Sequence, residues 1–337
     1  GSGKTCTSIG IAEGLKSHKR VLIMTPASLR ANFYKELKKC GDPLFRKNQY
    51  WEFVKTGKNE DLIRMISRAI SLPSGFIEKQ AGAWFINVQK PGNYSSLTAA
   101  QQRQLDQQLN EMIEAKYDFV NYNGLRESSL AKLTKNNTIN PFDNKVIIVE
   151  EAHNFVGRIA NKISRKETKS LSYALYQLLM SAQNARIVML TGTPVVNYPN
   201  ELGIMFNILR GYIRAFIFKL NILSERRINE AELMNILGPI STTDYIQYNP
   251  SNTTLTITRN PFGFVSVNKK GVYQGVSANE RGEIDDDSFV KIVASTLLKN
   301  DIKVVGKTVV REYKALPDEL TEFKNYFIDE DALGKSG

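Results

Sequence analysis

The first five residues, GSGKT, place glycine, lysine and a hydroxyl residue in the order of a phosphate-binding loop. They are the second half of the pattern G-x-x-x-x-G-K-[ST]. Lys4 is expected to contact phosphates and Thr5 to ligate a divalent metal ion, because a helix N-terminus presents N–H donors to anions. The other residues expected to line a bound nucleotide are Gly1, Ser2, Gly3 and Cys6. The alternative is an ordinary glycine turn before a helix.

Two adjacent carboxylates form the second candidate. In KVIIVEEAHNF an apolar run predicts a strand that ends at Glu150 and Glu151. Ligands of open α/β sheets bind at the carboxyl ends of the strands. One carboxylate could hold a hydrated metal ion while the other polarises an attacking water. The alternative is an acidic cap on a helix that begins near Ala152.

The third candidate, LTGTPVVN, follows another apolar run and contains Thr191, Gly192, Thr193 and Pro194. Small hydroxyl residues and a glycine let the backbone pass close to a nucleotide. The alternative is a turn that ends a strand.

Elements that could position these motifs alternate between strand and helix. Strands are predicted at 20–26, 117–122, 145–150 and 185–190, and helices at 7–15 and from Ser28 onward. This rhythm predicts a parallel sheet covered by helices. Residues 41–116 interrupt it with helices at 61–72 and 97–116 and a strand at 83–89, which we interpret as a mostly helical insertion. The glutamines of the helix at 97–116 are expected to form a solvated face.

The region after about residue 205 has a different character. Helices are predicted at 202–210, 229–237 and 286–299, with a strand-rich run at 244–267 and a strand at 307–316. We therefore predict two domains: an α/β lobe over 1–205 and a mixed α+β accessory region over 206–337.

Composition narrows the function classes. The 337 residues carry a formal charge of +11, which favours a polyanionic partner such as nucleic acid. The two cysteines, Cys6 and Cys40, are too few for a disulfide framework and suit a reducing, intracellular compartment. With only two histidines, a Cys/His zinc site is not expected. No apolar run reaches the roughly 18 residues of a membrane span, so no membrane partner is expected.

Together, GxGKT, EEAH and TGTP in this order resemble the superfamily 2 helicases and translocases, in their DExH/Snf2-like branch. Within that branch, LTGTPVVNYPNEL followed by FNILR is similar to ATPases of large nucleocytoplasmic DNA viruses, of the poxvirus early transcription factor small subunit and nucleoside triphosphate phosphohydrolase I type. The resemblance covers residues 1–40 and 117–210. It implies a RecA-like P-loop lobe that uses ATP and Mg²⁺.

The resemblance also implies residue roles. Lys4, Glu150 and Glu151 would be catalytic, with Thr5 and Glu150 at the metal and Glu151 at the attacking water. Coupling of hydrolysis to movement would involve His153, Thr191, Gly192 and Thr193. Contacts to the DNA or RNA backbone would come from Thr25, Pro26, Ser28, Asn121, Tyr122 and Asn123. The family usually has Asp where this chain has Glu150, so we expect ATP turnover to be retained but slower.

Two function hypotheses follow. The first is an ATP-dependent nucleic-acid motor in viral transcription, working with RNA polymerase or transcription-factor subunits in the host cytoplasm or the virion. The alternative is a nucleotide-switched transcription-factor subunit or scaffold without motor activity. No second RecA-like lobe with an arginine-bearing motif is recognisable, and the strand before the phosphate loop would lie upstream of Gly1. We therefore expect a fragment that hydrolyses ATP poorly alone and is marginally stable.

Overall fold

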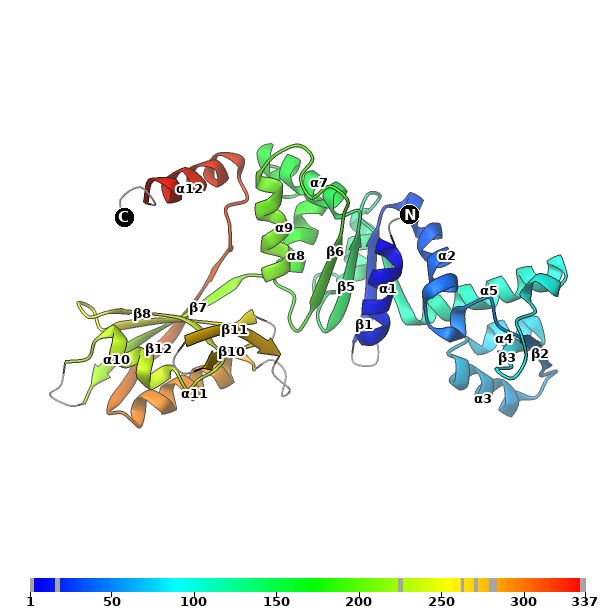
Figure 1. Ribbon diagram of the computed structural model, residues 1–337, viewed down its shortest axis with the longest axis horizontal. Helices are drawn as coiled ribbons and strands as arrows, with labels where there is room; N and C mark the ends of the chain where they lie inside the picture. Colours follow the sequence, from blue (N-terminus) through cyan, green and yellow to red (C-terminus); the bar gives the residue numbers. More distant parts are fainter. Residues whose placement is uncertain are drawn as a thin grey trace. The chain divides into compact units, whose positions relative to one another are not determined.

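The chain forms two compact units (Figure 1). The computed structural model describes residues 3–15, 19–223, 227–261, 264–269, 272–278 and 284–333. Unit 1 comprises Gly1–Lys162, Glu167–Leu175 and Ala185–Asn197, and unit 2 comprises Ile163–Lys166, Tyr176–Asn184 and Tyr198–Gly337. The sequence boundary between residues 205 and 206 stays a prediction.

A four-stranded parallel sheet forms the centre of unit 1. Its strands, in spatial order, are β4 (Tyr117–Asn121), β1 (Arg20–Thr25), β5 (Lys145–Glu150) and β6 (Arg186–Leu190). Its helical elements are α1 (Lys4–Leu15), η1 (Ala27–Leu29), α2 (Arg30–Cys40), α6 (Glu127–Leu133), α7 (Ala152–Ser164) and α8 (Leu171–Met180), the last two of which continue into unit 2. The predicted RecA-like α/β lobe with a parallel sheet is confirmed.

Two central strands of this sheet are buried along almost their whole length. Residues Val21–Met24 of β1 and Val146–Val149 of β5 are at most 1% exposed. Such continuous apolar runs are typical of parallel strands that are covered on both faces. Helix α7 buries Phe155, Val156 and Ile159 on one face, as an amphipathic helix packed on a core does.

The strand register brings the carboxyl ends of all four strands to one edge. Thr25 pairs with Asn121, Met24 pairs with Val149, and Glu150 pairs with Leu190. The loops that leave these strands therefore begin side by side, although they are far apart in sequence. This edge is where ligands of open α/β sheets bind.

The insertion packs beside α2 and shares one hydrophobic core with the sheet of unit 1. Its elements are η2 (Pro43–Phe45), β2 (Trp51–Lys55), α3 (Glu60–Ile70), α4 (Ser74–Gln80), β3 (Gly82–Ile86), η3 (Tyr94–Ser96) and α5 (Ala99–Lys116). Strands β2 and β3 pair antiparallel. Thr98 and Gln101 form a capping box at the start of α5, which satisfies N–H groups that the helix leaves unpaired. The predicted mostly helical insertion is confirmed.

Glutamines in α5 were expected to form a solvated face, and for Gln108 this expectation is wrong. Gln108 is 1% exposed, and its side-chain amide donates to the Trp84 carbonyl and accepts from the Trp84 N–H, both at 2.8 Å. The Gln108 amide thus satisfies both backbone groups of Trp84, as the backbone of a neighbouring strand would. Trp51 and Trp84 are both buried, so these two rings pack in the insertion core.

The two cysteines are joined in a disulfide, which the sequence analysis did not expect. Cys6 lies in the first turn of α1 and Cys40 ends α2, with their Cα atoms 5.8 Å apart. The bond therefore ties the helix that follows the phosphate loop to the neighbouring helix. Cys6 was also predicted to line the nucleotide, and that role stays a prediction.

Unit 2 is built on a four-stranded antiparallel sheet. Its strands are β12 (Ile302–Tyr313), β7 (Ile213–Ile222), β9 (Thr254–Arg259) and β8 (Thr243–Asn249), in that spatial order. The other elements are α9 (Asn200–Arg210), α10 (Glu230–Leu237), the hairpin β10 (Phe264–Lys269) and β11 (Val272–Ala278), α11 (Asp286–Leu298) and α12 (Leu320–Leu333).

The core of unit 2 lies between this sheet and helices α10 and α11. Phe216 and Phe218 of β7 pack with Leu233 of α10 and with Phe289 and Val293 of α11. The α+β character predicted for the accessory region is confirmed. Among the described residues of the chain, no helix has the length and apolar character needed to cross a membrane.

Candidate nucleotide site

The described part of the phosphate loop begins at Gly3, whose φ of +74° lies in the left-handed region that favours glycine. Helix α1 starts at the next residue, and the Gly3 carbonyl accepts a hydrogen bond from the N–H of Thr7 at 2.9 Å. The predicted nucleotide contacts Gly1 and Ser2 lie outside the described residues. Gly3 and Lys4 therefore form a glycine turn at a helix N-terminus, where an anion is stabilised.

Lys4 connects this turn to the TGTP segment. A Cβ atom added at Gly192 would lie 3.3 Å from the Lys4 Nζ, so glycine leaves room for the ammonium group. The Lys4 charge also acts on the Glu150 carboxylate. The structure thus brings all three sequence motifs to one site.

Glu150 is the buried acid of this site. It is 7% exposed, and its carboxylate accepts a hydrogen bond from the Thr5 hydroxyl. Its Oε1 atom has no hydrogen-bond partner among the described residues. Burial raises the pKa of Glu150 above its ordinary value and the neighbouring Glu151 charge raises it further, while the Thr5 hydrogen bond and Lys4 act in the opposite direction.

The oxygen atoms of Thr5 and Glu150 fit a small divalent cation. A hydroxyl and a carboxylate are hard ligands of the kind Mg²⁺ prefers. A buried carboxylate oxygen without a partner is costly, and a bound cation would offset that cost. These two residues are therefore suited to hold Mg²⁺ beside the phosphates that Lys4 would contact.

Glu151 occupies an uncommon backbone conformation directly after the strand. Its φ of +47° is in the left-handed region, which is rare for a residue with a side chain. Its Oε2 lies 3.5 Å from Nδ1 of His153, whose same nitrogen is 2.9 Å from the Thr191 hydroxyl. That hydroxyl also accepts a hydrogen bond from the Thr193 N–H at 3.1 Å. A continuous polar chain therefore runs from the acidic turn to the TGTP segment.

Tyr122 fixes the backbone of the acidic turn, which consists of Glu150 and Glu151. Its hydroxyl donates to the carbonyls of Glu150 at 2.8 Å and Glu151 at 3.1 Å, and its ring packs against Phe155 of α7. Tyr122 is 3% exposed, and burial together with the Glu151 charge raises the pKa of its phenol. Its side chain is placed to position the carboxylates, a role that the sequence analysis missed because an isolated tyrosine after a strand gives no signal for it.

The two segments predicted to contact nucleic acid leave neighbouring strands β1 and β4. Thr25, Pro26 and Tyr122 are buried, whereas Ser28 and Asn123 are exposed. Asn121 also belongs to these segments. Its Oδ1 atom is buried and has no hydrogen-bond partner within the described part of the chain. Contact of these segments with nucleic acid stays a prediction.

Comparison with known proteins identifies the family. Residues 1–196, more than half of the chain, match the family described as type III restriction enzyme, res subunit. The chain belongs to this family of superfamily 2 helicases. The matched region contains every motif of the nucleotide site described above. The res-subunit assignment thus confirms the resemblance seen in the sequence.

Relatives of this chain occur in large DNA viruses. It is 28% identical over 211 residues to a candidate ATP-dependent RNA helicase of Acanthamoeba polyphaga mimivirus, a match that covers 62% of this chain and 28% of the relative. A candidate helicase of Invertebrate iridescent virus 3 is 25% identical over 209 residues, covering 62% of this chain and 17% of the relative. The termination factor NPH-I homolog of African swine fever virus is 35% identical over 104 residues, covering 28% and 14%. The chain therefore spans less than a third of each of these relatives.

Proposed function

We propose that this chain supplies the nucleotide-binding lobe of an ATP- and Mg²⁺-dependent motor that moves along DNA or RNA. The observation that carries the proposal is the meeting of Lys4, Glu150 and the Thr191–Thr193 segment at the carboxyl edge of one parallel sheet. A scaffold that only binds nucleotide has no need for a second carboxylate beside the buried one. Glu151, half-buried and beside His153, supplies that group.

The residues divide the chemistry of phosphoryl transfer between them. Lys4 and the N-terminus of α1 bind the phosphates, and Glu151 accepts a proton from the attacking water or orients it. Thr5 and Glu150 would hold Mg²⁺, which would supply positive charge to the phosphate oxygens. His153 and Thr191 couple the nucleotide site to the segment that follows Leu190. Their contact joins the acidic turn to the TGTP segment, so a change at the bound nucleotide can move that segment.

We propose further that this motor works in viral transcription. This role is supported by the relatives in large DNA viruses, one of which is described as a termination factor. A transcription role implies RNA polymerase or transcription-factor subunits as partners, in the cytoplasm of a host cell or in the virion. The formal charge of +11 supports a nucleic-acid partner in either case.

The test is ATP hydrolysis by the full-length protein that contains this chain, with and without single- or double-stranded DNA or RNA. Glu151→Gln removes the proton acceptor and keeps the side-chain size, so hydrolysis should fall by at least about 100-fold, in the range typical of general-base loss. Affinity for ATP should change little, which equilibrium binding of a fluorescent ATP analogue measures. A hydrolysis rate that Glu151→Gln leaves unaltered would support the nucleotide-switched scaffold instead.

A further inference from the structure

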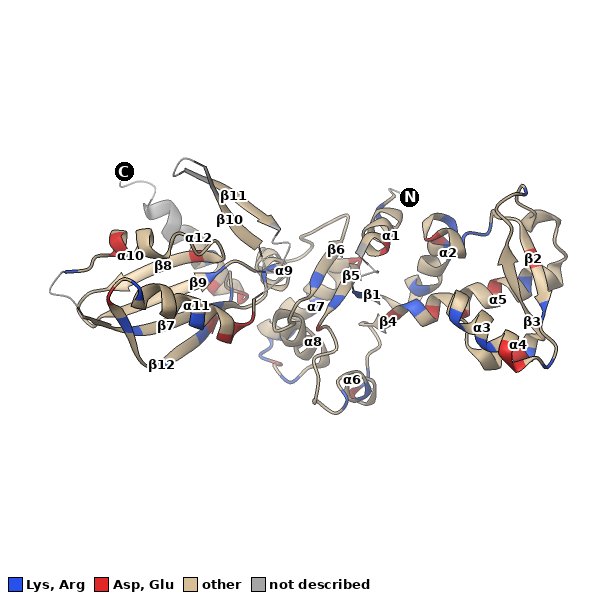
Figure 2. Ribbon diagram, turned by 90° about the horizontal axis from the view of Figure 1, so that it is seen from below, with Lys and Arg blue, Asp and Glu red and all other residues tan. Residues whose placement is uncertain are grey.

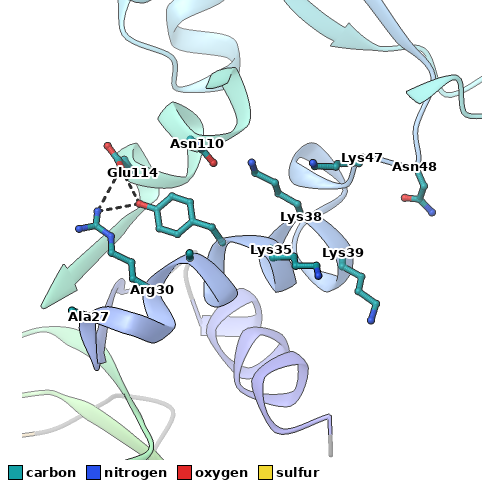
Figure 3. Close-up of a pocket in the computed structure, with 11 residues that line it drawn as sticks. Ala27, Arg30, Lys35, Lys38, Lys39, Lys47, Asn48, Asn110 and Glu114 are labelled. Carbon is teal, nitrogen blue, oxygen red and sulfur yellow. Dashed lines mark hydrogen bonds and ion pairs between the residues drawn. The ribbon is translucent and has the colours of Figure 1, made fainter. Parts of the chain in front are cut away.

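A groove of about 910 Å³ lies between α2 and the insertion, within unit 1. One wall is a continuous stripe of η1 and α2, and the opposite wall comes from the segment after η2 and from α5 (Figure 3). Along the stripe, Arg30, Tyr34 and Lys38 are four residues apart. Lys35 and Lys39 are also four apart and lie beside them, so the five side chains share one broad helix face. The groove is at the upper end of the size range of small-molecule pockets.

Positive charge dominates this groove. Its lining contains five cationic side chains, Arg30, Lys35, Lys38, Lys39 and Lys47, and one carboxylate, Glu114. Figure 2 marks the basic residues along α2. Glu114 is already engaged, because its carboxylate lies 3.4 Å from the Arg30 guanidinium and accepts a hydrogen bond from the Tyr34 hydroxyl at 2.9 Å.

The lysines of the groove have few carboxylate partners among the described residues. Lys38 and Lys47, whose side chains converge in Figure 3, share a single carboxylate, that of Asp106 at 3.5 and 2.5 Å. Lys35 and Lys39 are exposed, and neither has an ion-pair partner in the described part of the chain. The groove therefore holds a surplus of positive charge.

Burial makes this surplus costly for the unliganded protein. The Lys38 side chain is 10% exposed. Burial lowers its pKa and the nearby Lys47 lowers it too, whereas Asp106 raises it. An anion that entered the groove would offset this cost, which a neutral ligand could not do.

The groove opens onto the segment predicted to contact nucleic acid. Residues 25–29 contain three of those predicted contacts, Thr25, Pro26 and Ser28, and Ala27 of this segment also lines the groove. A strand held at that segment can therefore continue along α2 toward Lys47. Ala31 and the ring of Tyr34 add apolar surface between the charges, which suits sugars and unpaired bases.

We propose that this groove binds the sugar–phosphate backbone of a single nucleic-acid strand that continues from the 25–29 segment, with Lys35, Lys38 and Lys39 at its phosphates. The insertion then serves as the second wall of a nucleic-acid channel. This inference rests on the proposed function, because it extends the path of the same polymer. The volume of the groove, which is of small-molecule size, fits a short stretch of one strand better than two paired strands.

The test is a double substitution at the two exposed lysines, Lys35→Ala with Lys39→Ala, in this chain. Anisotropy of short labelled oligothymidylate and oligouridylate measures binding between about 50 and 200 mM salt. The double variant should lose about tenfold in affinity at low salt. Its slope of log affinity against log salt should fall by about 1.4, at 0.7 per phosphate contact for single strands.

The matched control is Arg64→Ala with Arg68→Ala on α3, which removes two exposed cations with the same i,i+4 spacing from the same unit. Its affinity should stay within about twofold of the parent. The proposal that the groove binds nucleic acid would be overturned if the two double variants lost equal affinity, or if the Lys35/Lys39 variant bound as the parent does. Either result would leave the proposed function standing. Failure of the unsubstituted chain to bind any oligonucleotide would overturn the groove as well, whereas the hydrolysis test of the full-length protein decides the proposed function. Competition by a blunt duplex as strong as that by a single strand would overturn the single-strand assignment.

Discussion

The His153 imidazole and the Thr191 hydroxyl lie 2.9 Å apart, Nδ1 to Oγ1, although 38 positions separate them in sequence. One residue follows the acidic turn of β5 and the other follows β6. Because parallel strands deliver their carboxyl ends to one edge, this contact needs no distortion of either strand. It links the turn that carries Glu150 and Glu151 to the segment that precedes Tyr198, where the chain enters unit 2 for the last time.

Loss of the contact between His153 and Thr191 should weaken the stimulation of ATP hydrolysis by nucleic acid more than it weakens basal hydrolysis. Thr191→Val keeps the shape of the side chain and removes the hydroxyl that both His153 and the Thr193 N–H contact. In the full-length protein, nucleic-acid stimulation of ATP hydrolysis should fall at least about fivefold, the lower end of typical coupling energies. Basal hydrolysis should change less. Thr138→Val, which removes an exposed hydroxyl elsewhere in unit 1, is the control, and an equal loss there would argue against a specific link.

The buried Glu150 predicts a pH-dependent stability. Its pKa in the folded state lies above the ordinary value of 4.5, chiefly because of burial. The folded protein therefore keeps this proton at a pH where the unfolded chain has lost it, so this group stabilises the fold at acid pH and its contribution declines as pH rises through the folded pKa. Glu150→Gln should raise the melting temperature near pH 8 relative to the parent and have little effect near pH 4.

Mg²⁺ should distinguish the parent from this variant. Added Mg²⁺ should stabilise the parent near pH 8, because a cation offsets the buried charge, and should not stabilise Glu150→Gln. Thermal melts with and without Mg²⁺ at both pH values measure this. A melting-temperature difference between parent and variant that is constant from pH 4 to 8 would show that Glu150 is not the titrating group.

Loss of the Tyr122 hydroxyl should weaken the positioning of the carboxylates. Tyr122→Phe leaves two carbonyls, those of Glu150 and Glu151, without this donor. The free energy of unfolding should fall by about 1–2 kcal/mol, as expected for lost buried hydrogen bonds. The kcat of ATP hydrolysis should fall while the KM for ATP stays nearly constant. Tyr94→Phe removes a phenol in the insertion and should leave kcat unaltered, so a similar fall there would assign the effect to general destabilisation.

The bond between Cys6 and Cys40 should make stability depend on redox conditions. It closes a loop with a sequence separation of 34 residues, for which chain entropy predicts roughly 3–4 kcal/mol of stabilisation. Cys40→Ser should lower the melting temperature under oxidising conditions and have a much smaller effect in excess reductant. Identical melts of the parent with and without reductant would show that the thiols remain unpaired in solution.

Much of the site could be read from the sequence because its parts are local. The strand ending at Glu150 and the helix after Lys4 are set by apolar runs and by a glycine turn, and both lie within a few residues of the predicted bounds. The order of motifs along the chain then predicts which strand ends meet. The fold class followed from the same alternation of strand and helix.

Pairings across long sequence separations could not be read in this way. Gln108 was assigned to a solvated face because its neighbours in the helix are polar, but the burial of its amide depends on where β3 lies. The hydrogen bonds of Tyr122 and the pairing of Cys6 with Cys40 depend likewise on strand order and helix packing. The basic stripe on α2 was not predicted either, although Lys35, Lys38 and Lys39 have helical spacing, because its opposite wall comes from the insertion.

The pairing of Gln108 with Trp84 has a consequence for the association of chains with one another. A two-stranded ribbon normally offers unpaired N–H and C=O groups along its edges, and such an edge can recruit a strand from another molecule. Here a side-chain amide occupies the backbone groups of Trp84 on β3. Helix α5 thereby covers the ribbon edge at Trp84 and protects it there against edge-to-edge aggregation, and Gln108→Ala would leave the N–H and C=O groups of Trp84 without these partners beneath the helix.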